Sequence, residues 1–435
     1  MERSFLARKV LVGTEIWEDT VISIKNGIIT AIEKLEETTI DPKEMRPLDG
    51  LLLPGLVNGH SHAFQVYLRG RADHPQNFRE WVDSFLYPLV LELDEKRLYQ
   101  ASYIAFRQMI RNGVTTVGEF HYIHNLGEET KEPAEIVIRA AMDAGIRIRL
   151  LYTGYDLGKK EGQKRFHRTP SEVLESLNFL WEKYHETPTV HIGAAPHSLH
   201  GASSEMIQSL TDWATQKNEI AHIHLAEQKS DIQESLDNFG KRPVEVLDSL
   251  DALSPHLSIV HGIWLDEDEI ELLGQNDVKH VYNPLTNMYL GDGIADLPSY
   301  LKYGVPTSVG TDANVSLDLL KEVRTAEWLQ RIKFLEMGIL KRFAKKSIDH
   351  ELFAMATRNG GLALNLPVGE IKVGNFADFI LIDDRDISLI PNSPFLNQLI
   401  SSYSMSHGLR AVWVAGNLVH ESKNTSRFSS PKKES

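Results

Sequence analysis

The stretch LLLPGLVNGHSHAFQ, residues 51–65, places two histidines directly after a short apolar run. Proline and glycine bound the run, which is typical of a buried strand. Side chains two positions apart in a strand point to the same side, so we expect His60 and His62 to face one point and Ser61 to face away. One strand end does not make a site by itself, so other parts of the chain must supply the partners.

Seven further strand-like runs follow, and helix-like segments separate them. The runs are VTTVGEF, IRIRLLYT, TVHIGAAP, IAHIHLAE, LSIVHG, KHVYNP and PTSVGTD. Together with the strand before His60 they give eight strands that alternate with helices. This α/β pattern predicts a closed, TIM-like (β/α)8 barrel. A doubly wound open sheet is the alternative, but its usual glycine-rich first turn is absent.

Both ends of the chain are rich in β-branched residues and glycine-centred turns, as in IKVGNFADFILID and LRAVWVAGNLVHE near the C-terminus. Neither end has enough strands to be stable alone, so we expect the two to form one small β-sandwich domain. The predicted divisions are residues 1–53 and 366–422 for this β domain, 54–365 for the barrel and 423–435 for a disordered tail. Residues 159–168 are polar and are predicted to form a surface loop.

The composition excludes several classes of function. The chain has 435 residues, 42% of them apolar, and a formal net charge of −14, which argues against a nucleic-acid partner. It has no cysteine, so disulfides, thiolate metal sites and a cysteine nucleophile are excluded. Charges interrupt every apolar run near the N-terminus, and no run is long enough to span a membrane. We therefore expect a cytoplasmic protein with no membrane partner.

Polar residues end most of the predicted barrel strands, where barrel enzymes carry their chemistry. His60 and His62 end the first strand, His224 lies at the end of the fifth, and His261 and Asp312 end the sixth and eighth. Buried polar groups at so many strand ends are costly unless they are paired or bound to a metal. Single histidines elsewhere, such as His222 and His280, are predicted to be structural.

The nitrogen and oxygen donors of His60, His62, His224 and Asp312 predict a site for one divalent metal ion. Zn²⁺ suits these ligands best, and Fe²⁺ or Mn²⁺ remain open. Such a metal lowers the pKa of a coordinated water towards ~7. Glu227, three residues after His224, can move a proton between that water and a leaving nitrogen. His261 can stabilise a developing oxyanion, and Asp312 can also accept a proton from the water.

The motifs PGLVNGHSH, HIHLAE, VHG and GTDAN, in this order, resemble the amidohydrolase superfamily. The two-metal members of this superfamily carry a carbamate bridge on a lysine at a strand end. This chain has no such lysine, so the resemblance is to the mononuclear-metal deaminase branch. It implies a metal-dependent hydrolase that acts on carbon–nitrogen bonds other than peptide bonds, in cyclic or linear amidines. The expected reaction releases ammonia from a C=N carbon of a small-molecule substrate, and a homodimer is the expected assembly.

Within this branch, GHSHAFQ, GEFHYIHN, APHSL and HIHLAEQ resemble the formimidoylglutamate deiminases. That resemblance implies that Gln65, Tyr122 and His197 line the substrate pocket. The arginines with which those enzymes hold substrate carboxylates are replaced here, by His200 in HSLHG and by Val82 in FREWVDSF. Neither side chain offers the bidentate fork of arginine. Arg69 and Arg71 are the candidates to replace them.

A second resemblance supports an alternative function. WVDSFLYPLVLEL and YNPLTNMYL are similar to segments of the S-adenosylhomocysteine and methylthioadenosine deaminases, which implies that Trp81 helps to enclose a purine nucleoside. A deaminase of adenosine or another aromatic base, or a chlorohydrolase using the same metal site, therefore remains open beside the formimidoylglutamate deiminase-like function. A metal-binding barrel without catalysis is disfavoured, because a passive metal site needs neither Glu227 nor His261.

Overall fold

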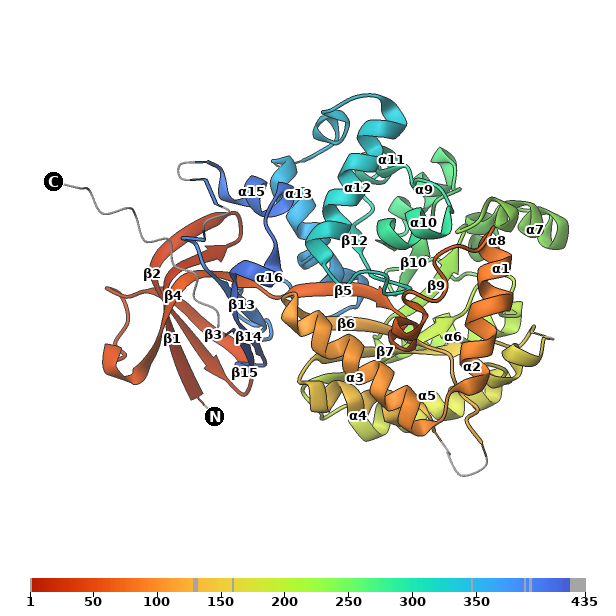
Figure 1. The fold of residues 1–435 in the computed structure, drawn as a ribbon, viewed down its shortest axis with the longest axis horizontal. Coiled ribbons are helices and arrows are strands. Elements are labelled where there is room, and N and C mark those ends of the chain that lie inside the picture. Colours follow the sequence, from red (N-terminus) through yellow and green to blue (C-terminus); the bar gives the residue numbers. More distant parts are fainter. Residues whose placement is uncertain are drawn as a thin grey trace.

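The computed structural model describes residues 2–127, 132–158, 160–345, 347–386, 389–390 and 393–422. The predicted tail at 423–435 lies outside these residues. Figure 1 shows two parts side by side, a barrel surrounded by helices and a smaller sheet built from the first and last strands of the chain. Among the described helices, none combines the length and apolar character needed to cross a bilayer.

The barrel strands follow one another in chain order. They are β5 (Leu56–Ser61), β6 (Val114–His121), β7 (Arg147–Gly154), β8 (Val190–Pro196), β9 (Ala221–Leu225), β10 (Leu257–His261), β11 (Lys279–Tyr282) and β12 (Thr307–Val309). All eight belong to one sheet in which neighbours pair in parallel. A parallel bridge between Ser61 and Asp312 brings the end of the sheet back to its first strand. The predicted α/β barrel is confirmed.

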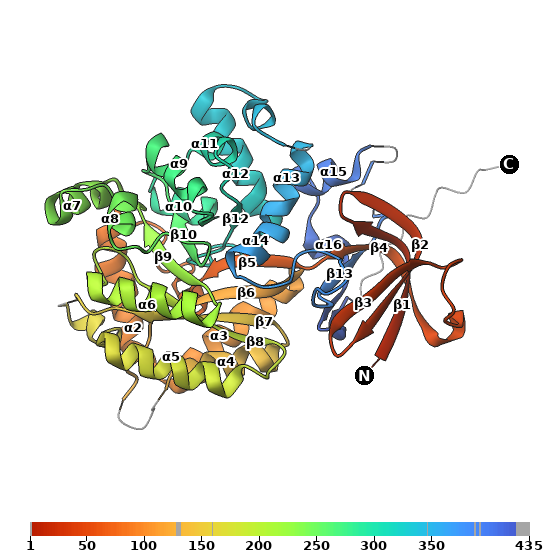
Figure 2. The same ribbon diagram turned by 180° about the vertical axis from the view of Figure 1, so that it is seen from behind.

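Helices surround the barrel, as both views show (Figures 1 and 2). They are α3 (Glu95–Arg111), α4 (Ala134–Ala144), α5 (Pro170–Tyr184), α6 (Ser204–Lys217), α7 (Lys229–Phe239), α8 (Pro243–Ser249), α9 (Glu267–Gln275), α10 (Pro284–Leu290), α11 (Leu297–Lys302), α12 (Leu319–Phe334), α13 (Ile348–Met355) and α14 (Arg358–Ala363). Helix α3 is typical. The Asp94 side chain caps it by accepting from the Arg97 amide, and its apolar residues recur on one buried face, which includes Leu98 and Phe106.

Short helices follow β5 and β7 along the chain. They are η2 (Ala63–Leu68), α1 (Phe78–Trp81), η3 (Val82–Leu86), α2 (Tyr87–Glu92) and η4 (Glu161–Arg165). The last of these corrects the prediction of a surface loop at 159–168, of which Lys159 lies outside the described residues. This otherwise polar segment is fixed to the barrel by Phe166, which directly follows η4, is only 3% exposed and packs into the hydrophobic core.

The small sheet has seven strands in the order β15-β14-β13-β4-β1-β2-β3, so both ends of the chain form it, as predicted. The strands are β1 (Glu2–Val12), β2 (Glu15–Lys25), β3 (Ile28–Lys34), β4 (Met45–Pro54), β13 (Phe379–Ile382), β14 (Leu409–Val414) and β15 (Asn417–Glu421), and the remaining helices are η1 (Pro42–Glu44), η5 (Ile339–Arg342), α15 (Phe395–Ser401) and α16 (Met405–Gly408). Phe5, Phe379 and Trp413 pack together in its core, with ring centroids 5.5–5.9 Å apart.

Two buried arginines near the start of β7 tie the barrel to the later part of the chain. Arg147 donates from Nε and Nη2 to the two oxygens of Asp378, at 2.7 and 2.9 Å. Arg149 donates to Glu219 and to the carbonyl oxygens of Ile192 and Leu364. These charges lie at the opposite end of the strands from the histidines and are fully paired.

Candidate active site

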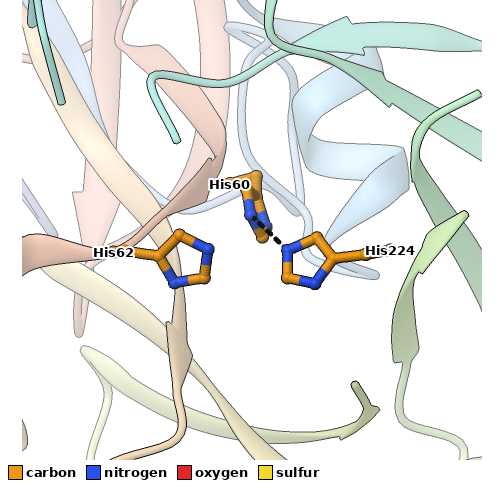
Figure 3. A group of neighbouring side chains, drawn as sticks. All are labelled: His60, His62 and His224. Carbon is orange, nitrogen blue, oxygen red and sulfur yellow. Dashed lines mark hydrogen bonds between the residues drawn. The ribbon is translucent and has the colours of Figure 1, made fainter. Parts of the chain in front are cut away.

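Three histidines converge at the carboxyl end of the barrel. We refer to His60, His62 and His224 as the histidine triad. Figure 3 shows their rings turned toward one another, with His60 and His62 carried by β5 and the residue after it, and His224 carried by β9. The Nε2 atoms of His60 and His224 are 3.1 Å apart, and one ring nitrogen of each member lies within 4.8 Å of those of the other two.

The triad is held in the neutral state that a metal ligand needs. Burial lowers the pKa of all three imidazoles, that of His62 to about 3. The Nδ1–H of His62 donates to the carbonyl oxygen of Phe120 at 3.0 Å, because a carbonyl can only accept. The lone pair of His62 therefore lies on Nε2, which faces the centre of the group.

A second group lies against the triad and supplies carboxylates. We refer to Glu227, His261 and Asp312 as the acid group, whose members each offer one ligand atom within 4.8 Å of the others. Asp312 Oδ1 lies 3.4 Å from Nε2 of His62 and 3.6 Å from Nε2 of His60. His261 Nε2 lies 3.7 Å from Glu227 Oε1 and 3.9 Å from Asp312 Oδ2.

Burial and neighbouring charge displace the pKa values of this group. Burial, with the nearby carboxylates of Asp292 and Asp312, raises the pKa of Glu227 well above its usual value. The raised pKa favours the protonated form of Glu227, which can donate a proton. Burial lowers the pKa of His261 to about 3, so its imidazole is neutral. A protonated carboxyl next to a neutral imidazole is suited to general acid catalysis.

The backbone at the strand ends is shaped to bring these side chains together. The Asp312 amide donates to the carbonyl of His60 at 3.0 Å, and the His62 amide donates to the carbonyl of Asp312 at 2.9 Å. Both His261, with φ of 75°, and Asp312, with φ of 45°, lie in the left-handed region that favours glycine. Such strain at two strand ends of one barrel is typical of functional sites, where it holds side chains in a fixed direction.

The donors of the triad and Asp312 fit a divalent metal. The Nε2 atoms of His60 and His224 lie 3.1 Å apart, and His60 and His62 are buried, so a divalent cation would find several ring nitrogens facing one point away from bulk water. Nδ1 of His60 has no partner among the described residues, so hydrogen bonding alone does not satisfy this ring. Three imidazoles with one carboxylate form a donor set that suits zinc, with iron and manganese as alternatives.

A cavity of about 170 Å³ opens over the triad and the acid group. Apart from these groups its walls are mainly aromatic and apolar. They comprise Gln65, Phe78, Trp81, Val82, Leu86, Tyr87, Tyr122, Tyr155, Gln163, Phe166, His197, His200, Leu290 and Ala313. Among the described residues, no lysine or arginine lines it.

Comparison with known protein families matches residues 51–419 to the amidohydrolase family. The chain belongs to this family. It is 32% identical over 355 residues to the 5-methylthioadenosine/S-adenosylhomocysteine deaminase of Thermococcus sibiricus, covering 81% of this chain and 78% of that protein. It is also 32% identical to the 5'-deoxyadenosine deaminase of Methanobrevibacter smithii, over 85% of this chain and 81% of that protein.

The amidohydrolase fold is shared with a solved adenosine deaminase from Xanthomonas campestris that contains bound zinc. The two structures superpose with a TM-score of 0.82 at 24% sequence identity, over 95% of this chain and 92% of that one. Family and relatives establish that this amidohydrolase is a hydrolase acting on carbon–nitrogen bonds, with deaminases among its relatives. They support the purine-nucleoside alternative better than the formimidoylglutamate deiminase-like function.

All five residues predicted from resemblance to bind substrate line the cavity of this amidohydrolase: Gln65, Trp81, Tyr122, His197 and His200. Their contact with substrate stays a prediction. Arg69 and Arg71 do not replace the missing carboxylate-binding arginines. Arg69 donates to the Asn314 carbonyl and to Gln108, and Arg71 is exposed outside the cavity walls.

Two histidines that were expected to be structural make structural contacts. His222 Nε2 lies 2.8 Å from the carbonyl oxygen of Ala363, and His280 Nε2 lies 2.9 Å from that of His261. Each is fully buried and is satisfied by main chain at that nitrogen. Neither belongs to the triad or to the acid group.

Sequence reasoning missed much of the aromatic wall. Tyr87, Tyr155 and Phe166 line the cavity, and Gln163 donates from Nε2 to both Tyr87 Oη and Tyr155 Oη, at 2.8 and 2.9 Å. These residues come from segments that are distant from the metal-binding motifs along the chain. The available signal was the apolar Phe166 inside an otherwise polar run, which indicates packing rather than a free loop.

Proposed function

We propose that this amidohydrolase hydrolytically deaminates 6-aminopurine nucleosides whose 5′ substituent contains no ionised group. One observation carries the proposal: the triad and the acid group open into a cavity whose described walls are aromatic and contain no lysine or arginine. Purine rings stack well on aromatic side chains, each base contributing about 1–3 kcal/mol of binding. The relatives that act on methylthioadenosine and 5'-deoxyadenosine support the same class.

The cavity disfavours a dicarboxylate such as formiminoglutamate. Binding two carboxylates in a buried site requires cationic or bidentate donors, and unpaired buried charges cost several kcal/mol. The side chains in the places of the missing arginines, His200 and Val82, offer one imidazole and one apolar group. Glu227 and Asp312 add acidic groups to the same cavity.

In the proposed reaction, water adds at C6 of the purine and the 6-amino group leaves as ammonia. A divalent metal held by the triad and Asp312 would lower the pKa of water and polarise the electrophile. Asp312 accepts a proton from the attacking water. Glu227, whose pKa is raised by burial, donates a proton to N1 of the ring as the C6–N1 double bond becomes single.

Collapse of the tetrahedral intermediate then breaks the bond from C6 to the amino nitrogen. His261 presents Nε2 toward Glu227 and Asp312, where it can hydrogen-bond the developing oxygen charge. Asp312 returns its proton to the departing nitrogen, and the proton of the C6 hydroxyl passes to Glu227, which restores both carboxyl groups. The balance is one nucleoside and one water giving one 6-oxopurine nucleoside and one ammonia.

The test measures ammonia release by the zinc-loaded protein on five substrates: 5'-deoxyadenosine, methylthioadenosine, adenosine, S-adenosylhomocysteine and N-formimino-L-glutamate. We expect kcat/KM for the nucleosides with a neutral 5′ group to exceed that for formiminoglutamate by about 100-fold or more, because each unpaired buried charge costs a few kcal/mol. Faster turnover of formiminoglutamate would refute the proposal. Equal turnover of S-adenosylhomocysteine and methylthioadenosine would refute the requirement for an uncharged 5′ group but would leave the proposed purine nucleoside deamination in place.

A further inference from the structure

We infer that Asn287 and Asp292 are positioning residues that hold the imidazole of His261 with its proton on Nε2, facing the reacting atoms. The inference rests on the proposed function for the catalytic role of His261, and on hydrogen-bond geometry for the tautomer. Neither residue lines the cavity. They lie behind His261, in α10 and in the turn that follows it.

The contacts form a chain that leads away from the site. The Asn287 side-chain nitrogen Nδ2 lies 3.0 Å from Nδ1 of His261 and 2.9 Å from Oδ2 of Asp292. Asn287 is fully buried and Asp292 is 2% exposed, so bulk water does not compete for these bonds. The amide of Asn283 faces the same His261 nitrogen from 3.5 Å.

The direction of these bonds follows from Asp292. The Asp292 carboxyl accepts from Gln228 Nε2 at Oδ1, and at Oδ2 it faces the side-chain nitrogen Nδ2 of Asn287. That nitrogen has two hydrogens, one directed to Asp292 and the other to His261. Nδ1 of His261 is therefore an acceptor without a proton, and the neutral ring carries its proton on Nε2. This is the nitrogen that lies 3.7 Å from Glu227 and 3.9 Å from Asp312.

Asp292 is itself anchored by loops that follow the two neighbouring strands. Gln228, the residue after Glu227, donates from Nε2 to Oδ1 of Asp292. Trp264, three residues after His261, donates from Nε1 to the Asp292 carbonyl at 2.9 Å. The turn before Asp292 requires a left-handed residue, and Gly291 with φ of 74° supplies it. Asp292 thus connects the loop that carries Glu227 to the amide that orients His261.

A merely structural role for this pair makes a different prediction from a positioning role. If the bonds only hold α10 in place, exchanging the amide and the carboxylate should preserve function, because the Asn–Asp hydrogen bond and the net charge remain. If they set the tautomer, the exchange should reverse it. A carboxylate at position 287 would accept from Nδ1–H of His261 and leave Nε2 without a proton.

The decisive variant is therefore the double exchange Asn287→Asp with Asp292→Asn. We expect it to fold, to bind zinc as the unaltered protein does, and to keep KM for 5'-deoxyadenosine within about threefold. We expect kcat to fall about 100-fold or more, since general acid–base and hydrogen-bonding groups contribute 10²–10⁴-fold. Asp292→Asn alone, which leaves the Asn287 amide free to turn, should give a smaller fall in kcat.

The tautomer is measured directly by ¹⁵N NMR of histidine-labelled protein, with the His261 signals assigned by their loss in His261→Asn. We expect Nε2 to be protonated in the unaltered protein and Nδ1 in the double exchange. A proton on Nδ1 in the unaltered protein, or normal kcat in the double exchange, would overturn the inference. The NMR result does not depend on turnover, so it stands even if no nucleoside proves to be a substrate.

Discussion

The two ends of the barrel both contain buried polar residues, and they differ in how those residues are satisfied. At the amino end, Arg147 and Asp378 form two parallel hydrogen bonds with side chains 0% and 1% exposed. At the carboxyl end, the triad brings one ring nitrogen of each member within 4.8 Å of the others, and the Nε2 atoms of His60 and His224 are 3.1 Å apart. Burial of polar residues alone therefore does not indicate a functional site. A functional site is indicated where several buried polar side chains lack complete hydrogen bonding and direct their donor or acceptor atoms at one point.

The physical reason is the cost of removing polar groups from water. In a buried ion pair with complete hydrogen bonds, every donor and acceptor is already used, so none remains to bind a further ligand. The triad instead leaves Nδ1 of His60 without a described partner and brings two ring nitrogens to 3.1 Å. An external cation could bind the Nε2 atoms of His60 and His224 that face each other, and none is needed at the amino end.

The sharpest test of this difference replaces two histidines of β9, one in each of two variants. His224→Ala should abolish stoichiometric zinc binding and lower kcat/KM about 10³-fold or more, because a metal supplies several kcal/mol of transition-state stabilisation. The matched variant His222→Ala removes a hydrogen bond to the Ala363 carbonyl. It should bind zinc and turn over normally while losing about 1–3 kcal/mol of unfolding free energy. Metal analysis measures the zinc content of the two variants, and denaturant unfolding measures their stability. If His222→Ala lost its zinc while His224→Ala kept it, the result would contradict the comparison.

A smaller effect is expected from the proton donor. Glu227→Gln keeps the shape and a hydrogen-bond donor but removes the transferable proton, so kcat should fall about 10²–10⁴-fold with zinc still bound. The control is Glu175→Gln on α5, an exposed carboxylate outside the cavity. It should leave kcat unchanged. Full turnover by zinc-loaded Glu227→Gln would show that another group protonates the substrate.

The smallest effect on turnover is expected at the amino end. Asp378→Asn leaves the guanidinium of Arg147 buried without its carboxylate, which should cost about 3–5 kcal/mol of stability. The folded fraction should keep its kcat and its zinc, because the contacts of Asp378 lie at the other end of the strands. Denaturant midpoint and kcat are measured on the same preparation. A large fall in kcat without a loss of stability would mean that the two ends are coupled.

Much of the fold could be predicted because its pattern is local. Hydrophobic periodicity along the chain indicates the alternation of strands and helices, and α3 begins at an Asp94 cap of the kind that marks helix starts in sequences. The strand ends could be predicted for the same reason, so His60, His62 and His224 were expected to meet, and they do. Their role as metal ligands stays a prediction, as do the catalytic roles of the acid group.

The aromatic wall and the support behind His261 could not be predicted in this way. Phe166 and Gln163 reach the cavity through a segment whose composition predicts a surface loop. Asn287 and Asp292 belong to a helix and turn whose sequence says nothing about which strand end they support. Only contacts between segments distant in sequence bring these residues to the site.

The sequence by itself determined the barrel, the joining of both chain ends in one sheet, and the set of donors placed at the strand ends. These follow from periodicity and residue chemistry, which act over a few neighbouring positions. The tertiary structure alone decided which buried polar groups are fully paired and which remain able to bind a ligand. It also decided which side chains enclose the cavity and which nitrogen of His261 faces Glu227. Those properties depend on distances of a few ångströms between residues far apart in the chain, and no local pattern encodes them.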